Sequence, residues 1–203
     1  MKKTLTINLA GLVFNIDEDA YYRLQEYLEK IKTYFSEEKE IDDIMNDIET
    51  RIAELLGEKL TPGKQVITLQ DVEETMKIMG EPREFGGFDN EEKKKSYYRT
   101  SSKRVYRDPD NRVLGGVCGG LGAYMGIDPI IIRIIFIIVF FGFGIGLFIY
   151  LILWIIIPEA KTTAQKLEMR GEPVNVSNIG NFVREEFENL KKSFKGKKKD
   201  TGG

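Results

Sequence analysis

The chain has 203 residues, with 30 Lys and Arg against 32 Asp and Glu, no histidine and a single cysteine, Cys118. One cysteine cannot form an internal disulfide, and the lack of histidine excludes the common zinc sites and every Ser/His/Asp or Cys/His catalytic unit. The length predicts one or two small domains, and we expect no metal, no cofactor and no enzymatic activity.

Charge is unevenly distributed along the chain. Residues 1–90 carry 11 basic and 20 acidic side chains, and residues 91–133 carry nine and five. Residues 134–157 carry none, and residues 158–203 carry ten and seven. The near-neutral total is therefore an average over an acidic region (1–90), a basic region (91–133), an uncharged block (134–157) and a basic C-terminal region (158–203).

Residues 1–85 are predicted to form a small acidic α+β domain that begins with a β-hairpin. Apolar and polar residues alternate over Thr4–Leu9 and again over Leu12–Ile16, and Ala10-Gly11 supplies a tight turn between them. A short extended piece is expected again at Gln65–Ile67.

Three amphipathic helices complete this predicted domain. Apolar residues recur at helical spacing after Asp17 and again after Glu40, and a third helix begins at Thr68, where Thr68–Asp71 resembles a capping box, and ends at Gly80. The acidic side chains lie largely off the apolar stripes and match no calcium-loop spacing, so we interpret them as solvated.

Residues 86–102 are rich in glycine, serine and charge and are predicted to be a linker. Its basic residues, together with Lys103, Arg104 and Arg107 and the interleaved tyrosines, resemble a nucleic-acid patch. We instead interpret them as the positive flank that holds one side of a membrane segment in the cytoplasm, and we expect no nucleic acid partner.

Four glycines follow within six residues: Gly115, Gly116, Gly119 and Gly120. A phosphate-binding loop is excluded, because Leu121-Gly122 stands where Lys-Ser/Thr is required. The small residues instead predict a short helix that presses against a second helix or the bilayer surface.

The next helix is predicted to begin at Asp128, as its N-cap, with Pro129 at the first helical position. Arg133 lies one turn further on. Its side chain either extends to the lipid headgroups or pairs with Asp128 or a partner protein.

The uncharged block Ile134–Ile157 is predicted to enter a membrane. As one helix its 24 residues would be about 36 Å long, enough to cross a hydrocarbon core of about 30 Å, and no face carries a polar stripe. Two alternatives stay open. The simpler is one span hinged at its glycines, with Gly142-x-x-x-Gly146 as a packing face; the other is a re-entrant hairpin of two half-helices.

At the far end of the block, Trp154 suits the membrane interface and Pro158 ends the helix. Residues 160–203 are predicted to be a polar linker followed by a basic amphipathic helix with Ser177 as its cap. The apolar side of this helix needs a covering surface: a membrane, another subunit or a coiled-coil partner. The excess of basic residues in 91–133 predicts a cytoplasmic N-terminal domain. A single span then places the tail outside, whereas a hairpin returns it to the cytoplasm.

Residues 103–159 resemble the PspC (phage shock protein C) domain in order and spacing. The residues that carry this resemblance are Leu114–Leu121, Ala123-Tyr124, Gly126–Pro129, Arg133 and Tyr150–Pro158. The resemblance is to the Bacteroidetes-type proteins that have an extra N-terminal domain. It implies a bacterial inner-membrane protein of the envelope-stress response that works by contacts with lipids and proteins. In the family, PspC partners with PspB and helps to draw PspA to the membrane, away from a transcriptional activator.

We therefore expect a regulatory membrane protein whose N-terminal domain binds a regulator or other phage-shock-type proteins. The alternative is a membrane scaffold without signalling, which forms homo-oligomers through Gly142-x-x-x-Gly146 and the C-terminal helix.

Overall fold

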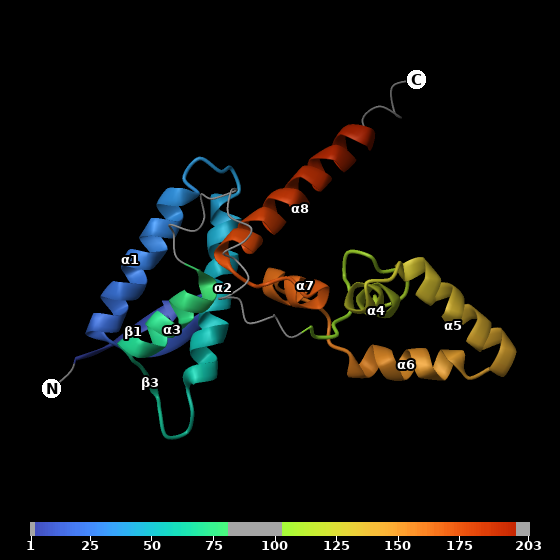
Figure 1. The fold of residues 1–203 in the computed structure, drawn as a ribbon, viewed down its shortest axis with the longest axis horizontal. Helices are drawn as coiled ribbons and strands as arrows, with labels where there is room; N and C mark the ends of the chain where they lie inside the picture. Colours follow the sequence, from blue (N-terminus) through green and yellow to red (C-terminus); the bar gives the residue numbers. More distant parts are fainter. Residues whose placement is uncertain (1–2, 81–102, 198–203) are drawn as a thin grey trace, which may run out of the picture. The chain divides into compact units, whose positions relative to one another are not determined.

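The computed structural model describes residues 3–80 and 103–197, so the predicted linker 86–102 lies outside the described residues. The chain folds as two units (Figure 1). One contains residues 3–80 together with residues 175–197, and the other contains residues 103–174. The predicted class, an α+β N-terminal region followed by helices, is confirmed at this level.

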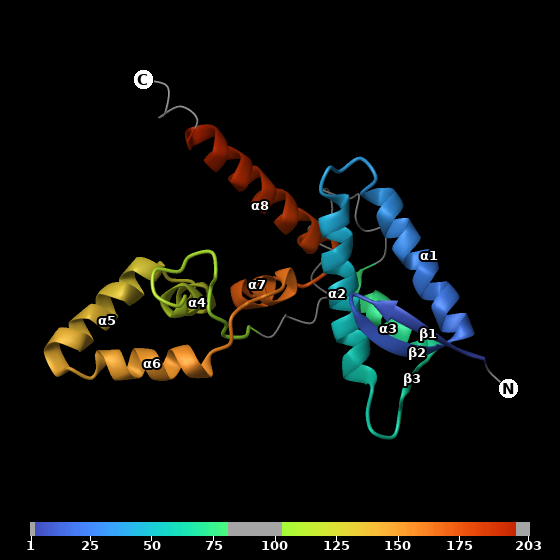
Figure 2. The same cartoon turned by 180° about the vertical axis from the view of Figure 1, so that it is seen from behind.

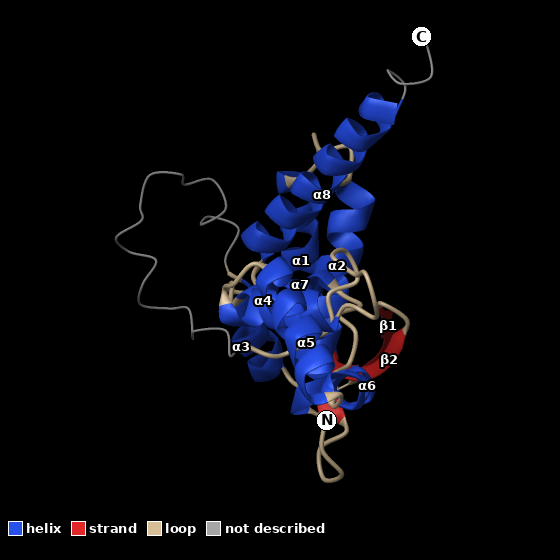
Figure 3. Cartoon of the chain, turned by 90° about the vertical axis from the view of Figure 1, so that its right-hand side faces the viewer, coloured by secondary structure: helices blue, strands red, loops and turns tan. Residues whose placement is uncertain are grey.

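The first unit begins with the predicted hairpin. β1 (Thr4–Leu9) and β2 (Leu12–Asp17) pair antiparallel, and the turn residues Ala10 and Gly11 both have left-handed backbones, with φ of 50° and 82°. A two-residue turn of this kind matches the twist of the two strands. β3 (Val66–Ile67) adds to β2 in parallel, which gives the strand order β1-β2-β3. Figure 3 shows that these strands are the only sheet among the described residues.

Three helices cover this small sheet: α1 (Glu18–Tyr34), α2 (Ile41–Lys59) and α3 (Leu69–Met79). Their apolar stripes form the core, and α1 and α2 lie side by side in Figure 2. The apolar stripe that helical spacing predicts for α1 is Tyr21, Leu24, Leu28, Ile31 and Phe35. It needs one correction, because Tyr27 is fully buried whereas Leu28 is only partly buried. The hydroxyl of Tyr27 donates to the carbonyl of Gly80 at 2.6 Å and so satisfies a group at the end of α3 that has no helical partner.

The predicted capping box at the start of α3 is confirmed, and its buried Asp71 also pairs with the partly exposed Lys64. Asp71 Oδ2 accepts hydrogen bonds from the backbone N–H (2.9 Å) and the hydroxyl (2.7 Å) of Thr68, while Asp71 Oδ1 accepts from Lys64 Nζ at 2.6 Å. Burial alone would raise the pKa of Asp71, but Lys64 and Thr68 outweigh it and hold that pKa below its ordinary value.

The C-terminal helix α8 (Val176–Lys197) belongs to the first unit, where it packs against α2. Its N-terminal cap is Asn175, whose Oδ1 accepts from the backbone N–H of Asn178 at 2.8 Å, and not Ser177 as predicted. Val176, Ile179 and Val183 are buried on this side. The covering surface that the sequence required for this half of the helix is therefore supplied by the chain's own N-terminal domain.

The second unit is formed by four helices: α4 (Val117–Met125), α5 (Pro129–Phe143), α6 (Gly146–Ile156) and α7 (Thr163–Arg170). α7 was not predicted, because the sequence indicated a polar, irregular stretch there. It begins with a capping box between Thr162 and Gln165 and packs on α4, and its Glu168 accepts a buried hydrogen bond from the Tyr106 hydroxyl at 3.1 Å.

The single hinged helix predicted over Ile134–Ile157 is wrong. α5 ends at Phe143, Gly144 adopts a left-handed backbone with φ of 67°, and α6 begins at Gly146 and runs back along α5 (Figure 1). Among the described residues, no helix is both long enough and apolar enough to cross a membrane. The apolar block is a helical hairpin, which was the second of the two alternatives.

We predict that Asp71→Asn lowers the free energy of unfolding by about 1–2 kcal/mol at neutral pH, because it removes the Lys64 pair and weakens the cap. The folded-state pKa of Asp71 is depressed, so this stabilisation is complete above the unfolded-state pKa of about 3.9 and is lost as the pH falls through the folded value. Denaturant unfolding of both proteins between pH 7 and pH 3 measures the difference.

The matched control is Glu26→Gln on α1. Glu26 also accepts from two basic side chains, Arg23 and Lys30, but its side chain is 53% exposed. Exposed pairs of this kind contribute little, so this variant should unfold like the wild type at every pH. An equal loss in both variants would contradict the role given to Asp71.

Candidate functional site

An extended strap, Tyr106–Asp108, closes the base of the α5–α6 hairpin. The N–H of Arg107 donates to the carbonyl of Pro158 at 2.8 Å, and the N–H of Ala160 donates back to the carbonyl of Arg107 at 3.0 Å. The N–H of Asp108 donates to the carbonyl of Gly116 at 3.0 Å. The strap therefore joins the residues that follow α6 to the residues that precede α4.

The Arg107 side chain reinforces the same closure. Its Nε donates to the carbonyl of Ile157 and its Nη1 to the carbonyl of Gly115, both at 2.9 Å. Its Nη2 lies 3.4 Å from Glu159 Oε2, and the guanidinium lies 6.0 Å from the centroid of the Trp154 ring. The planar fork of an arginine can reach several acceptors at once, which the point charge of a lysine cannot do.

Gly115 and Gly116 turn the chain into α4. Both have left-handed backbones, with φ of 62° and 79°. A Cβ on Gly115 would lie 2.6 Å from the Trp154 ring, and a Cβ on Gly116 would lie 2.3 Å from the carbonyl oxygen of Asp108. These two positions require glycine for both the backbone conformation and the space.

Gly119 and Gly120, on α4, let the strap lie directly on that helix. A Cβ on Gly120 would lie 1.7 Å from the carbonyl oxygen of Tyr106, and a Cβ on Gly119 would lie 2.9 Å from the Asp108 side chain. The sequence predicted close packing against a helix or a bilayer. The structure places both glycines instead against an extended segment of the same unit.

The turn between α4 and α5 is as predicted. Asp128 Oδ1 accepts from the backbone N–H of Ile130 at 2.7 Å, and Pro129 is the first helical residue. Arg133 makes a bond that the sequence did not predict, because its Nη2 donates to the backbone carbonyl of Asn111 at 2.9 Å. That bond ties α5 to the loop that precedes the glycines.

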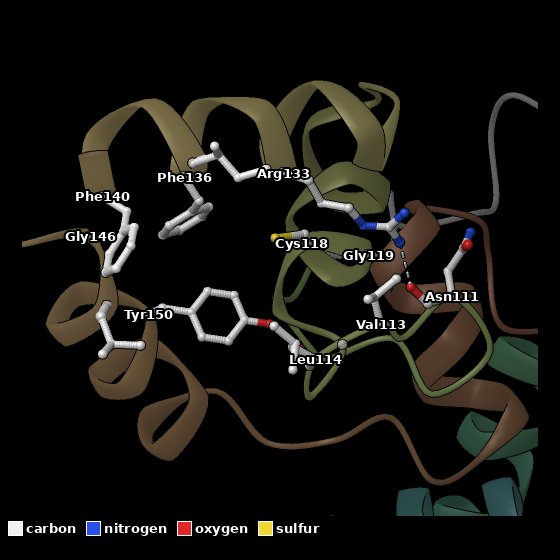
Figure 4. Close-up of a pocket in the computed structure, with 13 residues that line it drawn as sticks. Asn111, Val113, Leu114, Cys118, Gly119, Arg133, Phe136, Phe140, Gly146 and Tyr150 are labelled. Carbon is white, nitrogen blue, oxygen red and sulfur yellow. Dashed lines mark hydrogen bonds between the residues drawn. The ribbon is translucent and has the colours of Figure 1, made fainter. Parts of the chain in front are cut away.

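An apolar cavity of about 280 Å³ lies between α5 and α6 and is closed at one end by α4 and the loop 111–116 (Figure 4). Its lining residues are Asn111, Val113, Leu114, Gly116, Cys118, Gly119, Arg133, Phe136, Ile137, Phe140, Gly146, Leu147 and Tyr150. Figure 4 shows the rings of Phe136 and Phe140 on one side and Tyr150 on the other, with Arg133 near the loop. The cavity is thus a hydrophobic slot with one cationic group at its closed end.

Tyr150 connects α6 to the other walls of the cavity. Its hydroxyl donates to the carbonyl of Leu114, and its ring meets the ring of Phe136 edge to face, with centroids 5.4 Å apart. Both contacts join α6 to the opposite wall of the cavity.

Gly142 and Gly146 do not form the packing face that the sequence predicted, because they lie on different helices. Gly142 is exposed near the end of α5, and a Cβ there would meet nothing within 4 Å. A Cβ on Gly146, at the start of α6, would lie 2.7 Å from the backbone nitrogen of Phe140. Gly146 therefore allows the two helices to meet at the tip of the hairpin.

The lining of the site is mostly apolar. Burial raises the pKa of the Cys118 thiol, so the sulfur is neutral and weakly nucleophilic at physiological pH. The described residues contain no cluster of acidic and cysteine side chains able to hold a metal ion. What this arrangement can do is bind an apolar molecule or take part in a larger assembly.

Two important groups were missed by the sequence analysis. Arg107 was assigned to a basic flank, and Glu168 to a solvated linker, because each bonds to a group about 50 or more residues away. The available signal was the pairing of charged residues outside the uncharged block with aromatic ones: Arg107 with Trp154 near the end of the block, and Glu168 with Tyr106 across it.

Residues 103–160 match the PspC domain, and an additional region precedes them. Neither a curated protein nor a solved structure matches the chain.

We predict that Gly120→Ala lowers the free energy of unfolding of the purified full-length protein by about 1–3 kcal/mol, because the added Cβ would overlap the Tyr106 carbonyl. Gly142→Ala is the matched control. It is the same substitution in a helix with open space around it, and it should be neutral or stabilising by up to about 1 kcal/mol. Circular dichroism melts of both variants in detergent measure the difference. Equal destabilisation would contradict the packing described for α4.

We predict that Arg107→Lys destabilises the second unit by about 2–4 kcal/mol, since a lysine cannot serve both carbonyls. Arg112→Lys is the control, because Arg112 approaches the same Glu159 at 3.9 Å but has a side chain that is 64% exposed. The rate of limited proteolysis within residues 103–174 reports the opening of this unit. Similar rates for both variants would show that the Arg107 fork does not hold the hairpin closed.

Proposed function

We propose that this chain, which carries a PspC domain at residues 103–160, is an integral membrane regulator of a phage-shock-type envelope-stress response. It acts through contacts with lipids and proteins and not by catalysis. The observation that carries the proposal is the outer surface of the α5–α6 hairpin, which has no charged side chain from Ile134 to Ile157.

Most of the large apolar side chains on these two helices are exposed. Phe141 and Ile155 are each 80% exposed, Ile156 is 69% exposed and Phe148 is 65% exposed. An isolated exposed apolar residue needs no explanation, but a continuous apolar surface over two helices indicates a partner or a membrane. Full burial of each such side chain is worth about 1.5–3 kcal/mol.

The charges at the hairpin base favour a membrane over a protein partner. Arg107, Arg112 and Glu159 lie together at the base, with Trp154 beside them, while the tip around Gly144 has neither charge nor polar side chain. This is the polarity of an element that enters the bilayer tip first and keeps its base at the headgroups, where tryptophan is favoured. The localisation we propose is the bacterial cytoplasmic membrane.

The cavity gives the hairpin a means of responding to the bilayer. An acyl chain matches its apolar lining, and Arg133 at the closed end matches an anionic headgroup. Lipid in the slot would contact both helices, because the lining residues come from α5 and from α6.

The N-terminal unit is the part that we propose binds the regulator or another phage-shock-type protein. Its acidic surface suits a basic partner, and its hairpin tip exposes Leu12 and Val13, which are 52% and 67% exposed. The scaffold alternative loses one of its two proposed contacts, since Gly142 and Gly146 lie on different helices.

We predict that the wild-type protein resists carbonate extraction from membranes, and that Ile138→Lys moves it toward the soluble or aggregated fraction. A lysine at the centre of a membrane helix costs about 3 kcal/mol. Cell fractionation of a deletion strain that expresses each variant measures the distribution, and a reporter in the same strain measures stress-induced transcription.

Tyr22→Lys, at a 60% exposed aromatic residue of the N-terminal unit, is the control and should fractionate like the wild type. Loss of induction with Ile138→Lys but not with Tyr22→Lys supports the regulator. A wild-type protein recovered as soluble would contradict the membrane proposal. Unchanged transcription in the deletion strain, with altered membrane integrity, would favour the scaffold.

A further inference from the structure

The packing of α8 restricts where the end of the chain can lie. Ile179 is fully buried, Phe182 and Val183 are almost fully buried, and α8 packs against α2. A Cβ on Gly180 would lie 2.8 Å from the Phe35 ring, so the helix approaches the end of α1 closely. These contacts make α8 part of the folded N-terminal unit.

Polar contacts fix the position of α8 on that unit. Arg184 Nη2 lies 2.5 Å from Glu38 Oε1, and the Arg184 guanidinium lies 5.5 Å from the centroid of the Phe35 ring. One side chain thus engages both a carboxylate and an aromatic ring in the connection between α1 and α2. Apolar burial with a specific ion pair is typical of an intramolecular interface and not of a helix that docks anywhere.

The hairpin geometry leads independently to the same restriction. α5 has 15 residues and α6 has 11, so their lengths are about 22 Å and 16 Å, both below the hydrocarbon thickness of about 30 Å. The bridge between Arg107 and Glu159 brings together the chain before α4 and the chain after α6. The polypeptide therefore enters and leaves the hairpin at its base, at the same depth relative to a membrane.

We infer that α5 and α6 form a re-entrant membrane hairpin and that the N-terminal unit and α8 lie on the same, cytoplasmic, face. The inference rests on the membrane placement proposed above, but it follows from the α8–α2 interface and the closed base. It also satisfies the charge rule on both flanks, because a single span would place the ten basic residues of 158–203 outside.

Cysteine labelling of the full-length protein in cells tests this topology. In a Cys118→Ser background, Lys32→Cys on α1 and Lys192→Cys on α8 each place one thiol at an exposed position. With a membrane-impermeant maleimide, both thiols should be protected in spheroplasts and labelled only after permeabilisation. Labelling of Lys192→Cys in intact spheroplasts, with Lys32→Cys protected, would overturn the inference while the membrane proposal stands. Recovery of the protein in the soluble fraction would instead overturn both.

Cross-linking then tests the α8–α2 interface itself. Glu38→Cys with Arg184→Cys, in the same background, should be joined by a short membrane-permeant bismaleimide, because the two native side chains meet. A protease site placed within residues 86–102 makes the cross-link visible, since the two fragments then stay together after cleavage. The single-cysteine variants are the controls and should separate. Separation of the double variant, when both thiols are reactive, would contradict the docking of α8.

Discussion

The second unit depends on the arginine fork at the base of its hairpin. Arg107 bonds to the carbonyl of Ile157, which directly follows α6, and to the carbonyl of Gly115, which precedes α4. Neither carbonyl has a helical partner, so the fork satisfies two groups that would otherwise be costly to bury. The same interaction explains why two of the nearby positions are glycine. Gly115 makes room for the Trp154 ring beside the guanidinium, and Gly120 lets the strap reach the surface of α4.

Closure of the base decides the character of the apolar block. The strap bonds to Pro158, shortly after α6, while α6 runs back along α5 and leaves an apolar cavity between the two helices. Phe136 and Tyr150 line this cavity. The outward faces have no charged group to interact with water, so the constraint that shapes the hairpin also leaves it with a continuous apolar surface.

Features specified by neighbouring residues could be predicted from the sequence, and features specified by distant residues could not. The β-hairpin, the Thr68–Asp71 box and the Asp128-Pro129 helix start each depend on a few consecutive residues. The fold of Ile134–Ile157 does not, because uniform hydropathy has no period and the closing bonds come from Arg107. α7 escaped prediction because its buried Glu168 appears in the sequence as one more solvated charge. The partner of α8 escaped it because an amphipathic stripe does not identify what covers it.

The connection between the two units gives the proposed signalling a physical path. Only the five residues 171–175 separate α7, which packs on α4, from α8, which packs on α2. In the function proposed above, a change in the hairpin that shifts α4 would reach α7, which this short connection joins to α8. The α8–α2 interface buries Val176, Ile179 and Val183, at about 1.5–3 kcal/mol for each side chain. Separating the whole of this interface would cost more than a typical coupling free energy of about 1–3 kcal/mol. We therefore expect a membrane signal to open only the first turns of α8, which lie closest to the connection.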